Sequence, residues 1–356
     1  MFTKKTVREI SVKGQIVLVR TDYNVPLGAG VVMDDLRIKA SLPTIKYLLN
    51  HGASKVVLMS HLGRPDGKRE VSMSMRPVAV RLAELLPGVT VHFVGDVCGP
   101  DVEAAVEALP KGGVLLLENL RFFPDEEKNS EDYADEIVAS THADLFVQDG
   151  FGVVHRAHAS TDAITRLLPS VAGLLLEKEV EHLSEVIEKP QHPLLVIIGG
   201  AKVGEKQAMI DVFLPIADKI VVGGKIAADG YTNADSKVYV AEDFVEDNAG
   251  AKLDIGPKSV RKIIEMINEA KTIVWNGLLG QAEEETYAHA SLEIARAMGR
   301  SEAVTVVGGG DTAGFAENLA RTESGLHFTW ISTGGGASLD LLSGKSLPGV
   351  DALEDK

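Results

Sequence analysis

Short apolar runs alternate with helix-like segments along the whole chain. Each run is rich in β-branched and other apolar residues, and glycine or polar residues bound it, as expected of a buried strand. The runs lie at residues 15–20, 54–60, 113–118, 144–149, 192–198, 218–223, 271–275, 303–308 and 327–332. Strands that alternate with helices are typical of parallel sheets. The pattern therefore predicts an α/β protein built on parallel sheets.

A helix-like stretch at residues 171–189, closed by Pro190, separates the strands into two groups. The stretch is not rich in glycine or serine, so we expect a stiff helix rather than a flexible linker. The chain is long enough for two domains of ordinary size. We expect a first domain over 1–170, an interdomain helix over 171–189 and a second domain over 190–340.

Arginines follow the strands of the first group. In open α/β sheets, ligands bind beyond the carboxyl ends of the strands, so these positions matter. Any one of these arginines would more often be an ordinary solvated side chain. Together, in a chain of formal net charge −15, they predict a site for a small polyanion, because guanidinium groups pair with carboxylate and phosphate oxygens. They are Arg37, Arg64, Arg121 and Arg156.

Glycines follow the strands of the second group. The clearest case is residues 304–320, where a strand-like run leads through three glycines into a helix-like segment. A helix N-terminus beside such a turn can bind an anion, although an ordinary tight turn would explain the stretch taken alone. Asp311 beside bare phosphate would be unfavourable, so it predicts an accompanying Mg²⁺ ion. Lys202 and Lys206 lie four residues apart and can reach one phosphate chain from the same helix face.

Composition narrows the class of protein. Of 356 residues, 45% are hydrophobic and 24% are charged, as in a globular protein. The negative net charge argues against binding to nucleic acid or to an acidic membrane surface. No apolar run approaches the roughly 20 residues that span a membrane, and the N-terminus has no signal-like core. The only cysteine, Cys98, excludes an internal disulfide, and we interpret it as a buried thiol. These features predict a cytoplasmic enzyme.

Several familiar motifs are absent. The chain has no G-x-x-x-x-G-K-[ST] phosphate loop, no G-x-S-x-G nucleophile elbow and no H-E-x-x-H metal motif. Its glycine-rich turns do not match the dinucleotide fingerprint, which weakens an NAD-linked dehydrogenase as an alternative. His155 and His158 lack acidic or cysteine companions at ligand spacing, so structural or anion-binding histidines are favoured over a metal site.

The motifs that remain resemble those of the phosphoglycerate kinase family, in order and nearly throughout the chain. They read RTDYNVP, DDLRI, SHLGRP, ENLRF, HRAHAST, GGAKVGEK, WNG, GGGDTAGF and STGGGASLDLLSGKSLPGV. The resemblance implies phosphoryl transfer between 1,3-bisphosphoglycerate and ADP, giving 3-phosphoglycerate and ATP, with Mg²⁺. It implies two Rossmann-like three-layer domains with parallel sheets facing across a cleft. It also implies a monomer that acts on small molecules, with a tail (341–356) that packs back on the first domain.

The resemblance further implies roles for individual residues. The residues implied for phosphoglycerate binding are Asp22, Asn24, Arg37, His61, Arg64, Arg121 and Arg156. Those implied for the nucleotide are Gly199 and Gly200 near the base, Glu283 on the ribose, and Lys206, Asn276, Gly309, Gly310 and Thr312 on the phosphates, with Asp311 on the metal. Those implied for stabilising the transferred group are Arg37, Lys202 and the backbone N–H groups of Gly334 and Gly335.

The chain departs from the family in one region. Residues 223–227 read GGKIA where the family has GGGMA, and the apolar helix that normally follows is almost missing. That segment helps to form the adenine pocket in the family. We therefore expect weaker nucleotide affinity and looser base selectivity. The shortening also leaves open a non-enzymatic alternative, a weakened relative that binds phosphoglycerate but no longer uses nucleotide efficiently.

Overall fold

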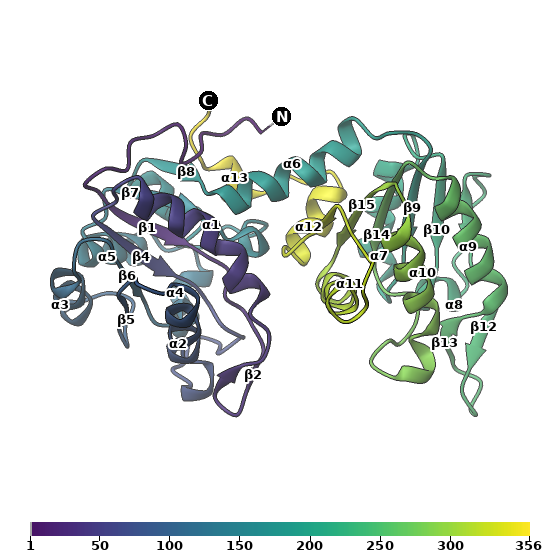
Figure 1. Cartoon of the computed structure of the whole chain (residues 1–356), viewed down its shortest axis with the longest axis horizontal. Coiled ribbons are helices and arrows are strands. Elements are labelled where there is room, and N and C mark those ends of the chain that lie inside the picture. The colour runs from purple at the N-terminus through teal and green to yellow at the C-terminus, as the bar shows by residue number, and fades with distance from the viewer. Residues whose placement is uncertain (1) are drawn as a thin grey trace. The chain divides into compact units, whose positions relative to one another are not determined.

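The structure is a computed structural model that describes residues 2–356, apart from the side chain of Glu205. The described chain divides into two compact units (Figure 1). The first unit comprises residues 2–179 and 346–356, and the second comprises residues 180–345. The C-terminal segment thus belongs to the first unit. Its backbone bonds to the start of the chain, where the Lys5 N–H donates to the Glu354 carbonyl at 2.8 Å.

The first unit is built on a six-stranded parallel sheet with the strand order β5-β6-β4-β1-β7-β8. The strands are β1 (Ile16–Arg20), β4 (Lys55–Met59), β5 (Val91–Phe93), β6 (Gly113–Leu116), β7 (Leu145–Gln148) and β8 (Ser170–Ala172). The helices are α1 (Leu36–Asn50), α2 (Arg76–Leu85), α3 (Pro100–Ala108), α4 (Pro124–Glu127), α5 (Glu131–Thr141) and α13 (Pro348–Asp351). A short antiparallel hairpin joins β2 (Leu27–Gly28) to β3 (Val31–Val32).

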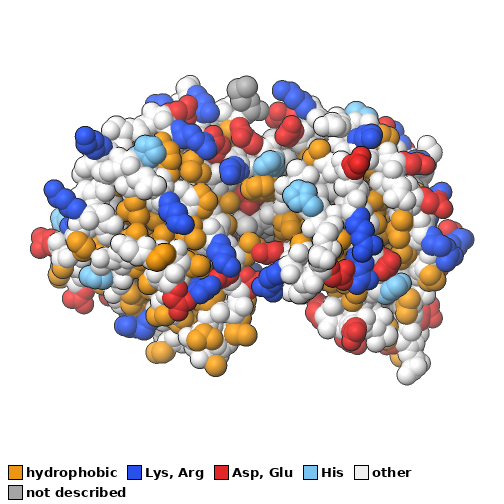
Figure 2. Space-filling model, viewed as in Figure 1, with side chains coloured by type: hydrophobic (Ala, Val, Ile, Leu, Met, Phe, Trp, Pro, Cys, Tyr) orange, Lys and Arg blue, Asp and Glu red, His pale blue; other side chains and the backbone are white. Residues whose placement is uncertain are grey.

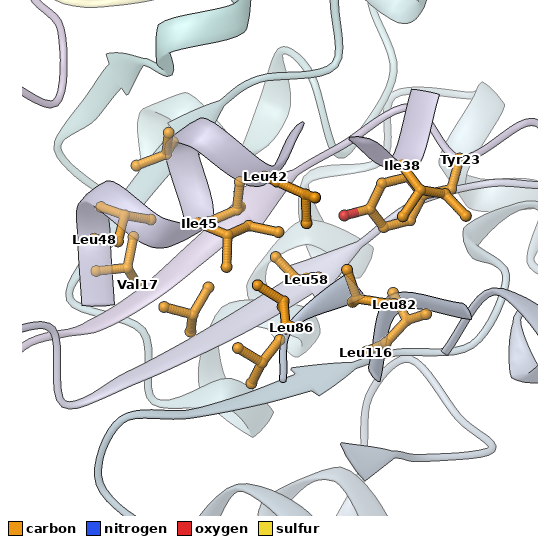
Figure 3. Packing of buried hydrophobic residues seen from close by; sticks show 14 of the residues in the cluster. Val17, Tyr23, Ile38, Leu42, Ile45, Leu48, Leu58, Leu82, Leu86 and Leu116 are labelled. Carbon is orange, nitrogen blue, oxygen red and sulfur yellow. The ribbon is translucent and has the colours of Figure 1, made fainter. Parts of the chain in front are cut away.

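The core of the first unit forms where α1 and α2 pack on one face of this sheet. Figure 3 shows Ile38, Leu42 and Ile45 of α1 pointing toward Leu58 of β4 and Leu82 of α2. Residues that point to the opposite face of the strands are also fully buried, so helices cover both faces. That double burial explains why the strands read as continuous apolar runs in the sequence.

The second unit repeats the plan, with a parallel sheet of strand order β11-β10-β9-β14-β15-β16. Its strands are β9 (Leu194–Ile198), β10 (Lys219–Val222), β11 (Val238–Val240), β14 (Thr272–Asn276), β15 (Val304–Gly308) and β16 (Trp330–Ile331). Its helices are α7 (Val203–Phe213), α8 (Gly224–Ala228), α9 (Pro257–Glu269), α10 (His289–Arg300), α11 (Gly310–Thr322) and α12 (Gly336–Leu342). An antiparallel hairpin, β12 (Phe244–Glu246) with β13 (Lys252–Ile255), is added beside it. The predicted α/β class, with two parallel sheets, is confirmed.

The connecting helix α6 (Leu174–Glu188) begins later than the sequence pattern indicates. Val171 lies in strand β8 instead, and Gly173 marks the break. Two side chains hold the start of the helix. The Leu174 N–H donates to Thr44 Oγ1 at 2.9 Å, and the Leu175 N–H donates to Asp149 Oδ1 at 3.0 Å.

Basic and acidic side chains are interspersed over the visible surface (Figure 2). The acidic excess is therefore not gathered on that face into one continuous field. No helix among residues 2–356 is both long and apolar enough to cross a membrane.

Candidate active site

The glycine-rich turns of the second unit surround a cavity of about 540 Å³ beyond the carboxyl ends of its central strands. The predicted residues that line it are Gly200, Lys202, Lys206, Asn276, Glu283, Gly309, Gly310, Asp311, Thr312 and Gly335. The structure thus brings predicted residues from distant segments together around one cavity. Gly199 and Gly334 are not part of its lining among the described residues.

The features of this cavity that suit an anion lie where β15 turns into α11. Gly309 adopts a φ of +89°, a left-handed conformation that a side chain would strain, and it precedes the first turn of α11. The N-terminal N–H groups of a helix have no partner within the helix, so they favour an anion. Thr312 in the same turn accepts a hydrogen bond from the Gly277 N–H at 2.9 Å, which fixes the loop after β14 against this helix.

Asn276 offers an unsatisfied donor to the cavity. Its side chain is fully buried at the end of β14, and its Oδ1 accepts a hydrogen bond from Lys206 Nζ. Its Nδ2 has no hydrogen-bond partner in the structure. Because an unpaired buried N–H is costly, this donor fits an acceptor oxygen supplied by a ligand, such as a phosphate oxygen.

Two predicted glycines have a structural role that the sequence did not indicate. A Cβ on Gly199 would lie 2.3 Å from the Leu278 carbonyl oxygen, so the loops after β9 and β14 meet backbone to backbone. The Gly334 N–H donates to Ser332 Oγ at 3.1 Å, so in this structure it is not a free donor for a transferred group. Gly335, with a φ of +51°, precedes α12 and does line the cavity.

Asp311 is suited to a metal ion that arrives with a phosphate. Its carboxylate is exposed in the first turn of α11 and lines the cavity beside Gly310. No group of three or more His, Cys, Asp or Glu residues within 2–356 is arranged to hold a metal ion by itself. A single carboxylate fits Mg²⁺, which commonly takes one or two protein carboxylates and completes its shell with water and substrate phosphates.

The first unit gathers arginines as the strand-end argument predicted. Arg64, Arg121 and Arg156 line a pocket of about 250 Å³ together with Phe123 and Glu127. Arg121 is almost buried, and its NH1 donates to the Gly63 carbonyl at 2.9 Å. Guanidinium groups on separate loops thus converge on one concave site, which suits a phosphate or a carboxylate.

A hydrogen-bond network ties the remaining predicted substrate residues to the same region. Arg37 NH1 donates to Asp22 Oδ2 at 2.7 Å, and Asn24 Oδ1 accepts from the Gly63 N–H at 2.8 Å. Gly63 therefore links Asn24 to Arg121, while Arg37 reaches the network from the first turn of α1. The predicted residues Asp22, Asn24, Arg37 and Arg121 form one connected group.

Two histidines in this region, His61 and His158, are held neutral. Burial, followed by the positive charges of Arg20 and Arg121, lowers the pKa of His61 well below its ordinary value. The same causes lower the pKa of His158 to about 3. A neutral imidazole can donate one hydrogen bond without adding charge to an already cationic site.

Several residues of these sites were missed by sequence reasoning. Phe244 and Lys252 of the β12–β13 hairpin line the cavity in the second unit, and the Lys252 ammonium lies 4.6 Å from the centre of the Phe244 ring. Beneath the first-unit cluster lie the fully buried Arg20 and Glu126. Arg20 stands in the RTDYNVP motif, which was the available signal, whereas nothing local marks Glu126.

Cys98 is partly buried rather than fully buried as predicted. Partial burial and the nearby Glu136 carboxylate raise its pKa to about 11, so the thiolate is scarce at neutral pH.

Comparison with known proteins decides between the alternatives. The sequence model described as "Phosphoglycerate kinase" matches residues 7–246 and 227–345. A phosphoglycerate kinase of Moorella thermoacetica is 42% identical over 398 residues, covering 99% of this chain and all of the relative. The chain belongs to the phosphoglycerate kinase family. A phosphoglycerate kinase of Roseiflexus sp. is 43% identical, with 99% of each chain covered.

Solved phosphoglycerate kinase structures share the fold over nearly the whole length. The enzyme of Pyrococcus horikoshii superposes with a TM-score of 0.85 at 29% identity, covering 99% of this chain and 98% of that structure. The enzyme of Coxiella burnetii superposes with a TM-score of 0.78 at 31% identity, covering 98% of each chain. The predicted family and kinase activity are therefore confirmed, and nothing in these comparisons favours the non-enzymatic alternative.

The comparisons also bear on the shortened region of this chain. The family match comes in two pieces that overlap at residues 227–246, and the alignment with the Moorella relative is 398 residues long although this chain has 356. Relatives therefore contain residues without a counterpart here. In the structure, α8 spans only Gly224–Ala228 before the chain turns toward β11.

Proposed function

We propose that this chain transfers a phosphoryl group reversibly between 1,3-bisphosphoglycerate and ADP, forming 3-phosphoglycerate and ATP. The observation that carries the proposal is the cavity of the second unit. It combines helix-terminal N–H groups, the orphaned Asn276 donor, Lys206 and the Asp311 carboxylate. Such a combination suits a metal-bound phosphate chain better than it suits any other small ligand.

On the nucleotide side, Gly309, Gly310 and Thr312 would hold the phosphates through the N-terminus of α11. Lys206 and Asn276 would bind phosphate oxygens from the neighbouring strand ends. Gly199 and Gly200 would lie near the base and Glu283 near the ribose hydroxyls. Asp311 would hold Mg²⁺, which when bound neutralises part of the phosphate charge.

On the acceptor side, the arginine cluster of the first unit would bind phosphoglycerate. The residues assigned to this task are Asp22, Asn24, Arg37, His61, Arg64, Arg121 and Arg156. The Asp22 carboxylate also accepts a hydrogen bond from Arg37, so it would help to orient that guanidinium as well. The acceptor oxygen is a carboxylate that is already anionic, so no general base is needed.

Catalysis would rest on positioning and on positive charge. Phosphoryl transfer has a loose transition state whose charge spreads over the equatorial oxygens of the transferred group. Arg37, Lys202 and the backbone N–H of Gly335 would stabilise that charge, and Gly334 would join them once its N–H leaves Ser332. We further propose that the chain works as a monomer in the cytoplasm, on small molecules alone. For its domains we propose boundaries near residues 170, 189 and 340, with the last residues of β8 counted in the first domain and residues 341–345 in the second.

A coupled assay with ATP and 3-phosphoglycerate tests the proposal. Replacing Lys202 by alanine should lower kcat by about a hundredfold or more, because one fixed positive charge is lost from the transition state. The matched control is Lys258→Ala, since Lys258 is an exposed lysine of α9 that pairs with Glu242 outside the cavity. An inactive wild-type chain, or equal rates for the two variants, would contradict the proposed function.

A further inference from the structure

A chain of buried polar side chains lies under the arginine cluster of the first unit and ends at His61. Its members come from four separate segments: Glu126 from α4, Ser160 from the loop that follows β7, Arg20 from the end of β1, and His61 from the loop after β4. Glu126, Ser160 and Arg20 are fully buried, and His61 is 3% exposed. None of the first three belongs to the residues proposed above to contact phosphoglycerate.

The donors and acceptors between Arg20, Ser160 and Glu126 follow from their chemistry. Arg20 Nε donates to Ser160 Oγ at 2.7 Å, so the hydroxyl must turn its own hydrogen elsewhere. That hydrogen goes to Glu126 Oε1, at an oxygen–oxygen distance of 2.6 Å. Glu126 Oε2 accepts the Ser160 N–H at 3.1 Å. The carboxylate therefore accepts hydrogen bonds from both the hydroxyl and the N–H of Ser160, which fixes the hydroxyl oxygen toward Arg20.

Each of the three guanidinium nitrogens of Arg20 makes a hydrogen-bond contact. NH1 donates to the Thr21 carbonyl at 2.5 Å, and NH2 lies 3.4 Å from His61 Nδ1. Arginine has five N–H donors and no acceptor, so Nδ1 of His61 has to be the acceptor in this contact. The proton of the neutral ring must then reside on Nε2.

We propose that Arg20, held by Ser160 and Glu126, is a positioning residue that fixes His61 in its Nε2–H tautomer for binding of the acceptor substrate. The proposal deepens the proposed function, because it rests on His61 being part of the phosphoglycerate site. Arg20 itself acts through His61 and is not required to touch the substrate.

The charges around His61 support a single neutral tautomer. Arg20 faces it from β1, Arg37 from α1, Arg121 from the segment after β6, and His158 from the loop after β7. All of these groups oppose protonation of the ring when they carry positive charge, and burial opposes it further. Without the Arg20 contact, either ring nitrogen could carry the proton, and one of the two tautomers would turn an acceptor rather than a donor toward an anion.

Nitrogen NMR of histidine side chains tests the tautomer in the full chain without substrate. The spectrum distinguishes protonated from unprotonated ring nitrogens, and the signals lost in His61→Gln assign the ring. In the wild type we expect Nδ1 unprotonated and Nε2 protonated, with no change between pH 6 and 8. A proton on Nδ1, or a ring that titrates in this range, would overturn the proposal.

Removing Ser160 from this hydrogen-bonded series of side chains should free the His61 ring to adopt either tautomer. In Ser160→Ala, Arg20 loses the acceptor of its Nε, so we expect mixed tautomers of a ring that stays neutral, because burial and the neighbouring cations are unchanged. The KM for 3-phosphoglycerate should rise roughly tenfold at both pH 6 and pH 8, while the KM for ATP stays unchanged. The matched control is Ser140→Ala, which removes a buried serine of the same unit that bonds the Gly99 N–H and the Glu136 carbonyl.

The outcomes separate this proposal from the proposed function. The expected tautomer in a chain without kinase activity would support the positioning role of Arg20 and refute the function. Kinase activity together with the Nδ1–H tautomer would support the function and refute the positioning role of Arg20. If Ser160→Ala gives the same His61 signals and the same KM as Ser140→Ala, Arg20 is not a positioning residue. Should Ser160→Ala fail to fold, the wild-type spectrum still tests whether His61 carries its proton on Nε2.

Discussion

At the residue scale, Asn276 shows how one side chain can prepare a site for a ligand. Its amide oxygen is occupied by Lys206, and its amide nitrogen is buried without a partner. Leaving a buried donor unsatisfied costs about 1–3 kcal/mol, a cost that a bound phosphate oxygen would remove. Asp311 differs, because its carboxylate is exposed to water, so a metal ion would replace solvating water there rather than satisfy a buried group.

Asp311→Asn tests the proposed metal role of that carboxylate. The variant keeps the size of the side chain but loses the charge that would hold Mg²⁺. We expect kcat/KM for ATP to fall by about a hundredfold and the Mg²⁺ concentration needed for half-maximal rate to rise. The measurement is the initial rate at several Mg²⁺ concentrations. Asp340→Asn is the control, because Asp340 lies on α12 and pairs with Lys345, which follows that helix. An unchanged Mg²⁺ dependence in Asp311→Asn would refute the assignment.

At the element scale, the sequence predicted the strands that are long and buried. Every apolar run identified became a strand of a parallel sheet, because burial on both faces leaves a continuous hydrophobic signal. Strands β5 and β11 were missed because none of their residues is fully buried, and β8 because its three residues merge with the helix pattern that follows. Such short elements are set by their neighbours in the sheet rather than by their own sequence.

The residues of the two candidate sites also divide into those that the sequence could predict and those that it could not. Those at strand ends were predictable, since topology brings the carboxyl ends of parallel strands together. Phe244 and Lys252 were not, because they lie on the β12–β13 hairpin outside the parallel sheet, and only its folding brings them to the cavity. Glu126 was not predictable either, because its partners Ser160 and Arg20 lie far away in the sequence.

The short helix α8 should affect nucleotide recognition. With only Gly224–Ala228 and the β12–β13 hairpin beside the cavity, the base would meet fewer contacts than in relatives with the longer segment. We expect weak ADP binding and a preference for ADP over GDP below about tenfold, because discrimination depends on groups that contact the base. Titrations with ADP, GDP and tripolyphosphate measure this, with the Moorella relative as the control. Strong selection of ADP would show that the base pocket is intact.

The start of helix α6 predicts a pH effect on stability. Burial raises the pKa of Asp149 from its ordinary value of 3.8 to about 7, although its Oδ1 accepts the Leu175 N–H. The folded state therefore holds this proton more tightly than the unfolded state does. The resulting stabilisation is complete below pH 4 and is lost as the pH rises toward 7.

Asp149→Asn removes this titration while it keeps an acceptor for Leu175. We expect the variant to exceed the wild type in free energy of unfolding by roughly 2–4 kcal/mol at pH 8, and by much less at pH 4. Denaturant unfolding at both pH values gives the difference. Asp101→Asn, which changes an exposed carboxylate in the first turn of α3, should show no such trend. A variant that is less stable than the wild type at pH 8 would contradict the expected sign.

At the scale of the whole molecule, the two halves of the proposed chemistry reside in different compact units. The cationic cluster belongs to residues 2–179, and the glycine-lined cavity belongs to residues 180–345. Transfer of a phosphoryl group requires the acceptor oxygen and the phosphorus to meet in one water-free site, since water would hydrolyse the acyl phosphate. A closing motion that joins the two half-sites remains a prediction of this chemistry.

The stereochemistry of transfer tests the central claim most directly. ATP made chiral at its γ-phosphorus with oxygen isotopes would be incubated with the chain and 3-phosphoglycerate, and the configuration of the transferred group determined. Direct in-line passage from nucleotide to acceptor predicts inversion at phosphorus. Retention, which would require a phosphorylated side chain between two transfers, would contradict the account.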